Sequence, residues 1–241
     1  MNPAYFFDMD GVISDTQKIH AAREYAHLTQ IIGGIPQYQW ADLTPDLITA
    51  HFAGVKASYW MTQILQGHGI AHTPEQVEDD LCRLHDTLAS DIESGRVNVD
   101  PIPGSFEFMI RLIQRNRYIT VITASKAKLA EKVLEKMNVR DGIKHIFSAE
   151  DLAKYEWGKA NPQVFTDMLQ ELWLPPNYPF IMFEDGKSGI AGANAAGGKT
   201  VGILGDRHES SLPWAHQYLR DFRWLTPEKL DTILNSSYVR H

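Results

Sequence analysis

Cysteine and basic charge are both scarce in this sequence. Its 241 residues include one cysteine, Cys82, so no disulfide can form within the chain, and we expect a reducing compartment such as the cytoplasm. The 23 lysines and arginines are outnumbered by 30 aspartates and glutamates, which gives a net charge of -7. Because proteins that bind nucleic acid usually carry a basic surface, we expect no nucleic-acid partner, and a few local cations would have to hold any anionic ligand.

Long apolar runs are also missing. No run approaches the roughly 18 residues that a transmembrane helix needs, and the N-terminus lacks the basic and then apolar segments of a secretory signal. We therefore expect a cytoplasmic monomer with no membrane partner. Hydrophobic residues make up 44% of the chain and charged residues 22%, which is typical of a globular protein rather than a disordered one.

What the sequence does contain is a regular alternation of short apolar runs and amphipathic stretches. Helical patterns lie between the strand candidates, and this order predicts an α/β fold, with a parallel sheet covered by helices on both faces. Ligands of such sheets bind beyond the carboxyl ends of the strands. The strand candidates are Tyr5–Phe7, Tyr118–Thr123, His145–Ser148, Phe180–Phe183 and Thr200–Leu204, and the helical patterns are Ser105–Asn116, Lys126–Met137, Pro162–Trp173 and Lys187–Ala196.

Residues 16–99 break this alternation. They show helical patterns and no convincing strand, and they fall between the first and second strand candidates. We therefore predict a helical cap domain, residues 16–99, inserted into a catalytic core formed by residues 1–15 and 100–241. The helical patterns of the insertion are His20–Ile31, Val55–Gln66 and Pro74–Ile92, and a further helix is expected near residues 224–234 of the core.

The first strand candidate runs directly into two aspartates. In the stretch Asp8-Met9-Asp10-Gly11, residues two apart on an extended chain point to the same side, so both carboxylates can face one ligand while Met9 packs inward. Two explanations for these neighbouring negative charges stay open at this point. The pair is either a turn of solvated acids or a set of oxygen ligands for a divalent cation such as Mg²⁺.

Polar residues follow other strands of the predicted sheet in the same way. Thr123 ends the second strand candidate and Ser125 lies just beyond it. Glu184 and Asp185 come after the fourth, and Lys159 precedes a helix. Taken singly, each has an ordinary explanation, such as a helix cap, a surface lysine or an acidic loop. Together they predict one site in which hydroxyls and a lysine hold a phosphate and the acidic residues hold a metal.

Four segments then carry a family resemblance: FDMDGVISDT, VITAS, GKANPQVF and FEDGKSGIAGANAAG. In this order they resemble the four motifs of the haloacid dehalogenase-like superfamily of phosphotransferases, and in particular its sugar-phosphate phosphatases and β-phosphoglucomutases with a helical cap. The resemblance covers nearly the whole chain and is looser in the cap. It implies a Rossmann-like core with an inserted α-helical cap, Mg²⁺ as the cofactor and a small phosphomonoester as the substrate.

The resemblance also implies a role for individual residues. Asp8 matches the nucleophile that becomes an aspartyl phosphate, and Asp10 matches the acid that protonates the leaving oxygen and then the base that activates water. Thr123 and Lys159 match the hydroxyl and lysine that hold the phosphate. The implied metal ligands are Asp8, Asp10, Glu184 and Asp185, and the expected substrate-binding residues are His20, Lys56, Ser125 and Lys126.

Departures from the family pattern bear on the reaction. The dehalogenases and phosphonatases of the superfamily lack the second aspartate, so Asp10 argues against both. Mutases grip a second phosphate with a cap arginine, which is Ala57 here, and their asparagine after the Ala-Ser-Lys triplet is Ala127. These losses favour a phosphatase. A β-phosphoglucomutase-like mutase is the alternative, and a non-catalytic protein that binds phosphorylated ligands is less favoured.

One further pattern suggests nucleotide binding but fails on its context. Residues 193–200, ANAAGGKT, nearly match a P-loop, yet Ala193 replaces the first glycine. The predicted order is also helix, turn, strand rather than strand, loop, helix. We interpret Gly197 and Gly198 as the C-cap of a helix instead.

Overall fold

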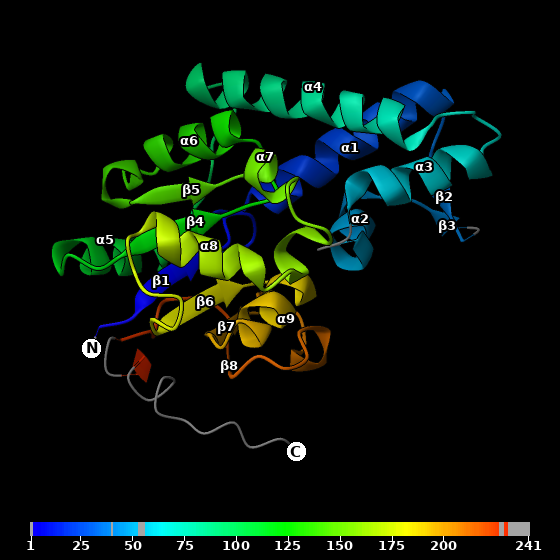
Figure 1. Cartoon of the computed structure of the whole chain (residues 1–241). Helices are drawn as coiled ribbons and strands as arrows, with labels where there is room; N and C mark the ends of the chain where they lie inside the picture. The colour runs from blue at the N-terminus through cyan, green and yellow to red at the C-terminus, as the bar shows by residue number, and fades with distance from the viewer. Residues whose placement is uncertain (1, 40, 53–55, 227–228, 231–241) are drawn as a thin grey trace. The chain divides into compact units, whose positions relative to one another are not determined.

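The computed structural model describes residues 2–39, 41–52, 56–226 and 229–230 of the chain. The chain divides into two compact units, residues 1–15 with 99–241, here called the core unit, and residues 16–98, here called the helical unit. Figure 1 shows the helices and strands of each. All of the strand ends at which the sequence predicts a site belong to the core unit.

The core unit is built on a six-stranded parallel sheet with the spatial order β5-β4-β1-β6-β7-β8. Since β1 lies between β4 and β6, the chain moves first to one side of β1 and later to the other. Such a reversal places the ligand-binding edge of an α/β sheet at the carboxyl ends of these central strands. The strands are β1 (Ala4–Phe7), β4 (Ile119–Ile122), β5 (His145–Phe147), β6 (Phe180–Glu184), β7 (Lys199–Ile203) and β8 (Gln217–Leu219).

Helices cover both faces of this sheet. Phe6 and Phe7 are successive residues of β1, so their side chains point to opposite faces. The ring of Phe6 lies 6.5 Å from that of Phe165 in α8 (Gln163–Glu171), and the ring of Phe7 lies 6.3 Å from that of Phe108 in α5 (Ser105–Gln114). All four rings are buried, which confirms the predicted Rossmann-like α/β core. Other helices of the core unit, among the residues that the structure describes, are α6 (Ala127–Lys136), α7 (Ala149–Leu152) and α9 (Lys187–Ala195).

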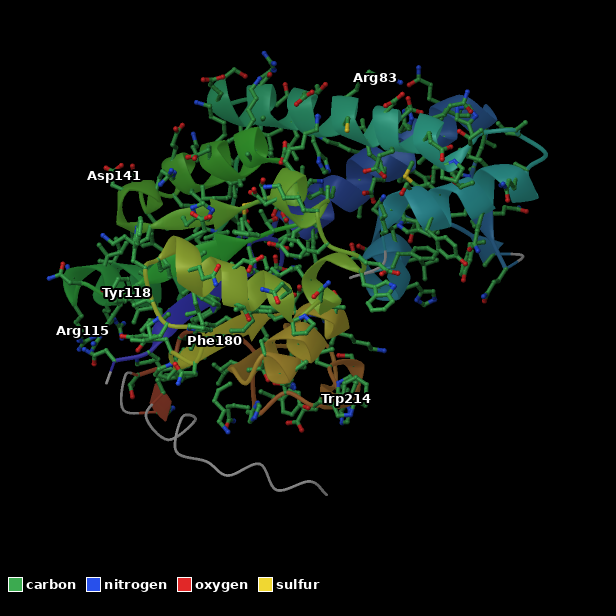
Figure 2. The ribbon with its side chains drawn as sticks, in the orientation of Figure 1. Arg83, Arg115, Tyr118, Asp141, Phe180 and Trp214 are labelled. Atoms are coloured by element: carbon green, nitrogen blue, oxygen red, sulfur yellow. The ribbon has the colours of Figure 1, made fainter. Side chains whose placement is uncertain are left out.

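The two ends of the sheet differ in chemistry. Tyr118 and Phe180, labelled in Figure 2, mark the amino ends of β4 and β6. Tyr118 stacks edge-on against Tyr178 there, with ring centroids 6.3 Å apart. At the opposite, carboxyl ends of the same strands, Thr123 follows β4, and Glu184 and Asp185 lie at the end of β6.

Five of the described helices end in a Schellman motif. The residue after the C-cap donates its amide to the carbonyl three residues back, and the next residue donates to the carbonyl five back. Both bonds require a residue in the left-handed conformation after the C-cap. Several predicted helices were one or two residues too long, because their predicted ranges included these cap residues. The left-handed residues are Gly69, Asn116, Asn138, Trp173 and Gly197. Gly197 confirms the predicted C-cap, and since β7 follows it, residues 193–200 form no P-loop.

The helical unit contains the described helices α1 (Thr16–Ile32), α2 (Pro45–Phe52), α3 (Ala57–Gly67) and α4 (Pro74–Glu93). Its apolar core includes Leu28, Met61 and Leu81, from α1, α3 and α4. β2 (Gln37–Tyr38) pairs with β3 (Ala41–Asp42), so our expectation of no strand in this region was wrong. Strands of two residues are too short to show an alternating pattern in the sequence.

Other segments also differ from the sequence-based expectation. α2 and the edge strand β8 were not predicted. Eight residues carry too little helical periodicity, and Gln217–Leu219 do not form a buried apolar run. The predicted start of a helix at residue 55, and most of the helix expected near residues 224–234, fall outside the described residues. None of the described helices combines the length and the apolar character that crossing a membrane requires.

Candidate active site

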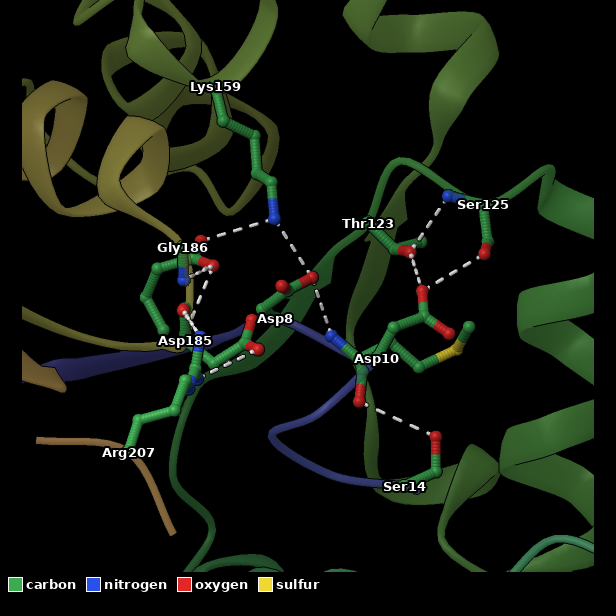
Figure 3. Close-up of polar contacts among 11 residues, drawn as sticks. Asp8, Asp10, Ser14, Thr123, Ser125, Lys159, Asp185, Gly186 and Arg207 are labelled. Carbon is green, nitrogen blue, oxygen red and sulfur yellow. Dashed lines mark hydrogen bonds and ion pairs between the residues drawn. The ribbon is translucent and has the colours of Figure 1, made fainter. Parts of the chain in front are cut away.

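The carboxyl ends of the three central strands bring polar residues together. β1 is followed by Asp8, β4 is followed by Thr123, and β6 ends on Glu184 and is followed by Asp185. Because β1 is paired with β4 on one side and with β6 on the other, these residues lie on neighbouring strands at one edge of the sheet. All four are buried. Figure 3 shows their contacts.

A tight turn separates Asp8 from the residues that follow it. Gly11 has a φ of 82°, in the left-handed region that favours glycine. The amides of Ile13 and Ser14 both donate to the carbonyl of Met9, at 2.9 and 3.1 Å, and the Met9 side chain is fully buried, as predicted. These hydrogen bonds tie the residue before Asp10 to residues that follow it, so the backbone of the turn that carries Asp10 is fixed.

Lys159 lies between two of the carboxylates. Its Nζ atom is 2.9 Å from Asp8 Oδ1 and 3.1 Å from Glu184 Oε2, and its side chain is only 11% exposed. Burial by itself lowers the pKa of Lys159, but the Asp8 and Glu184 carboxylates more than offset this and raise the pKa above its ordinary value. The lysine is therefore a fixed positive charge that offsets the repulsion between the acids and can attract an anionic ligand.

Two glycines of α9 make room for this arrangement. A Cβ atom on Gly189 would lie 1.8 Å from Glu184 Oε2, and a Cβ atom on Gly192 would lie 2.1 Å from the carbonyl oxygen of Lys159. Both distances are far inside van der Waals contact. The absence of side chains at these two positions lets α9 pack directly against the groups that hold Lys159 in place.

Asp8, Glu184 and Asp185 form what we call the acidic cluster. Each offers a carboxylate oxygen, and these oxygens lie within 4.8 Å of one another. Burial, and next the Asp8 carboxylate, raise the pKa of Glu184 well above its ordinary value, while Lys159 opposes that shift. Three buried carboxylates are a hard-oxygen donor set, and a divalent cation would stabilise their ionised forms, so these residues fit a metal such as Mg²⁺.

Asp10 is held differently from Asp8. Its Oδ2 atom accepts hydrogen bonds from Thr123 Oγ1 at 3.1 Å and from Ser125 Oγ at 3.0 Å. The sequence suggested Asp10 as a metal ligand. Among the described residues, however, the group of carboxylates close enough to share a metal contains Asp8, Glu184 and Asp185 and not Asp10. The structure thus joins Asp10 to the two hydroxyls at the end of β4.

Arg207 was not singled out from the sequence. It follows β7, and its guanidinium donates to Asp185 Oδ2 at 3.1 Å and to the Asp185 carbonyl at 2.9 Å. It lies 22 residues beyond Asp185 in the chain. No motif spacing or strand-end position marks it, so only the fold reveals its place beside the acidic cluster.

The expected substrate-binding residues are divided between the two units. Ser125 lies in the site, and Lys126 follows it as the half-buried N-cap residue of α6. His20 and Lys56 belong to the helical unit. The His20 ring packs edge-on against a histidine of α4, with centroids 5.0 Å apart, and Lys56 Nζ is 3.0 Å from a glutamate of α4 on the exposed surface.

Comparisons with solved structures give similar folds at low sequence identity. A family IA, variant 3 hydrolase of the haloacid dehalogenase type from Entamoeba histolytica is 18% identical, with a TM-score of 0.76 over 97% of this chain and 100% of that one. β-Phosphoglucomutase from Clostridium difficile is 22% identical, with a TM-score of 0.68 over 98% of both chains. CbbY from Rhodobacter sphaeroides, solved with phosphate, is 17% identical, with a TM-score of 0.76 over 96% of this chain and 100% of that one.

A search among curated proteins found no match. The family model described as haloacid dehalogenase-like hydrolase, in contrast, matches residues 5–203, from the first strand of the core unit to the end of β7. That span includes both aspartates after β1, Lys159, and the acidic pair at the end of β6. The chain belongs to the haloacid dehalogenase-like hydrolase family.

Proposed function

We propose that the protein is a magnesium-dependent phosphatase that hydrolyses a small phosphomonoester through an aspartyl phosphate on Asp8. The observation that supports this most strongly is the different setting of two aspartates that a single residue, Met9, separates. Asp8 belongs to the acidic cluster and forms an ion pair with Lys159. Asp10 instead accepts hydrogen bonds from Thr123 and Ser125. Two carboxyl groups in different environments can divide the roles of nucleophile and acid–base between them.

In the first step, Asp8 attacks the phosphorus atom and Asp10 gives a proton to the leaving oxygen. Lys159 offers its ammonium group to the phosphoryl oxygens, and Thr123 offers its hydroxyl. Phosphoryl transfer needs positioning and charge neutralisation above all. Mg²⁺, held by the acidic cluster, would supply further positive charge to the transferring group.

In the second step, Asp10 accepts a proton from water as that water attacks the phosphorus atom of the aspartyl phosphate. The bond between Asp8 and phosphorus breaks, phosphate leaves, and both aspartates return to their starting state. The hydroxyls of Thr123 and Ser125 orient the Asp10 carboxyl through their hydrogen bonds, at 3.1 and 3.0 Å. Such orientation is what a general acid and base requires.

A sugar phosphate or related metabolite is the substrate class that we favour. CbbY was also solved, as a mutant, with xylulose-(1,5)bisphosphate, and a predicted phosphoglycolate phosphatase from Haemophilus somnus has a similar fold. We further propose that His20, Lys56, Ser125 and Lys126 contribute to substrate binding, and that residues 16–98 act as the cap. The single cysteine and the negative net charge support a cytoplasmic enzyme, which we take to be monomeric, without nucleic-acid or membrane partners.

Phosphate release from a panel of phosphorylated sugars, sugar acids and nucleotides tests the proposal. We expect turnover with Mg²⁺, none with a chelator, and none in Asp8→Asn, which removes the nucleophile with little change of shape. Asp141→Asn is the matched control. Asp141 is an exposed aspartate that follows the C-terminus of α6, whereas Ser125 and the rest of the site precede its N-terminus. Full turnover with chelator would contradict the metal assignment.

The same panel separates the alternatives. A mutase would convert a sugar phosphate into its isomer, with a bisphosphate as the activator, and would release little free phosphate. A non-catalytic binding protein would be stabilised by a phosphorylated ligand and would turn over none of them. Either result would replace the proposed phosphatase.

A further inference from the structure

We propose that Arg207 is a positioning residue for the metal site: it holds Asp185 in the orientation that binds the cation. This inference rests on the proposed metal-dependent function. Arg207 makes two hydrogen bonds to Asp185, one to the side chain and one to the main chain, so both the carboxylate and the backbone that carries it are fixed. Figure 3 shows the guanidinium beside Asp185 at the edge of the acidic cluster.

The guanidinium is itself anchored to β7. Its Nη2 atom donates to the carbonyl of Ile203 at 3.0 Å, and its Nε atom donates to the carbonyl of Leu204 at 3.2 Å. β7 is paired with β6, the strand that leads into Asp185. Arg207 therefore joins the ends of two neighbouring strands through a planar group whose donors point in fixed directions, which a lysine could not reproduce.

The charges around the cluster are consistent with this role. Asp8, Glu184 and Asp185 carry three formal negative charges, and Lys159 and Arg207 supply two positive ones. With all three carboxylates ionised, as a bound cation favours, the cluster keeps a net negative charge. Arg207 then moderates the repulsion between the acids and still leaves attraction for the cation.

Removal of Arg207 has two opposing effects on metal affinity. Loss of its positive charge favours a cation. Asp185 is only 5% exposed, but the Arg207 side chain is 30% exposed, so solvent screens the guanidinium, and we set the gain at up to about fivefold. Loss of an outer partner that orients a metal ligand typically weakens binding by ~10- to 100-fold. The orienting effect is larger, so we expect the metal to bind more weakly without Arg207.

Direct binding of Mn²⁺ to the full chain, followed by electron paramagnetic resonance, tests this without relying on turnover. Arg207→Met loses the orienting effect but gains from the lost charge, so it should raise the Kd for Mn²⁺ by ~2- to 100-fold. Arg207→Lys keeps the charge but not the geometry, and it too should bind more weakly than the native protein. Arg223→Met is the matched control, because Arg223 is an exposed arginine that pairs with Asp221 rather than with the acidic cluster, so its loss should leave the Kd unchanged.

A second measurement separates positioning from a general loss of structure. In phosphate release, Arg207→Met should need more Mg²⁺ for half-maximal rate, while kcat recovers at saturating Mg²⁺. An unchanged Kd for Mn²⁺, or a kcat that stays low at saturating Mg²⁺, would overturn the role proposed for Arg207 and leave the proposed metal-dependent function standing. Failure of the native protein to bind Mn²⁺ would overturn the proposed metal-dependent function as well.

Discussion

Asp10 is the residue whose hydrogen bonds best separate acid–base chemistry from metal binding. In Asp10→Asn the amide oxygen can still accept from Thr123 and Ser125, so the local geometry should survive. Both proton transfers would be lost, and each is typically worth ~100- to 10,000-fold in rate. The loss in the first step should be large with a sugar phosphate and small with nitrophenyl phosphate, since nitrophenolate leaves without a proton.

Single-turnover measurements on these two substrates check that prediction. Attack of water on the phosphoenzyme also needs the base, so the second step should slow equally for both. If the first step slows to the same extent with both substrates, Asp10 does not protonate the leaving group.

The positions of the strand-end residues could be predicted from the sequence, because each follows an apolar run that reads as a strand. Asp8, Thr123 and Glu184 are of this kind, and parallel pairing then places them at one edge of the sheet. Two features could not be predicted. Arg207 depends on the pairing of β6 with β7, and the division between Asp8 and Asp10 depends on the turn at Gly11.

At the scale of elements, α9 depends on the absence of a side chain at Gly189. In Gly189→Ala the new Cβ atom would overlap Glu184 Oε2, which would displace the carboxylate from Lys159 or push α9 outward. We expect a loss of ~1–3 kcal/mol in the free energy of unfolding, as for other overpacked sites, together with weaker metal binding.

Urea unfolding and Mn²⁺ binding measure the two effects of Gly189→Ala. Gly67→Ala is the control, because nothing lies within 4 Å of a Cβ atom at that position and its φ is not left-handed. A Gly189→Ala variant as stable as the control, with native metal affinity, would show that α9 adjusts without disturbing Glu184.

The end of α8 offers a test of the Schellman caps. Trp173 occupies the left-handed position with a φ of 58°, and 95% of its surface is exposed to solvent. The left-handed conformation costs an ordinary residue roughly 1–2 kcal/mol, which glycine avoids. Trp173→Gly should therefore raise the free energy of unfolding by up to ~1 kcal/mol, since part of the gain is lost to the greater freedom of glycine in the unfolded chain.

Equilibrium unfolding in urea measures the change. Asn138→Gly serves as the comparison, because asparagine already tolerates the left-handed position at the end of α6 and should gain less. A clear loss of stability in Trp173→Gly would mean that the indole contributes packing that its exposure does not suggest.

At the scale of the whole molecule, long alternating patterns could be predicted and short elements could not. The central strands β1, β4 and β6 have four or five residues, all buried, and are visible in the sequence as apolar runs. Helices such as α4 and α6 carry apolar faces that are visible as a helical period. The β2–β3 hairpin and α2 are too short for such a signal. Their existence follows from packing within the helical unit rather than from local periodicity.

We expect the helical unit to move relative to the core unit when a ligand binds. The chain crosses between the units twice, and the hydrogen bond from the Asp15 amide to the Asp100 carbonyl, at 2.8 Å, joins the two crossings on the core side. Closure of a cap excludes water from phosphoryl transfer. Small-angle scattering with Mg²⁺ and beryllofluoride should show a smaller radius of gyration than without them, and an unchanged profile in both conditions would count against a large closure.

Capture of the phosphoenzyme tests the central proposal most directly. Asp10→Asn, mixed with Mg²⁺ and nitrophenyl phosphate, should form the aspartyl phosphate and hydrolyse it slowly, so the intermediate should accumulate. Peptide mass spectrometry after acid quenching should then find one phosphoryl group on the peptide that contains Asp8, and none when Asp8 is also changed to Asn. Release of nitrophenol with no phosphoryl group on the chain, or with the group on another residue, would contradict the assignment of Asp8 as the nucleophile.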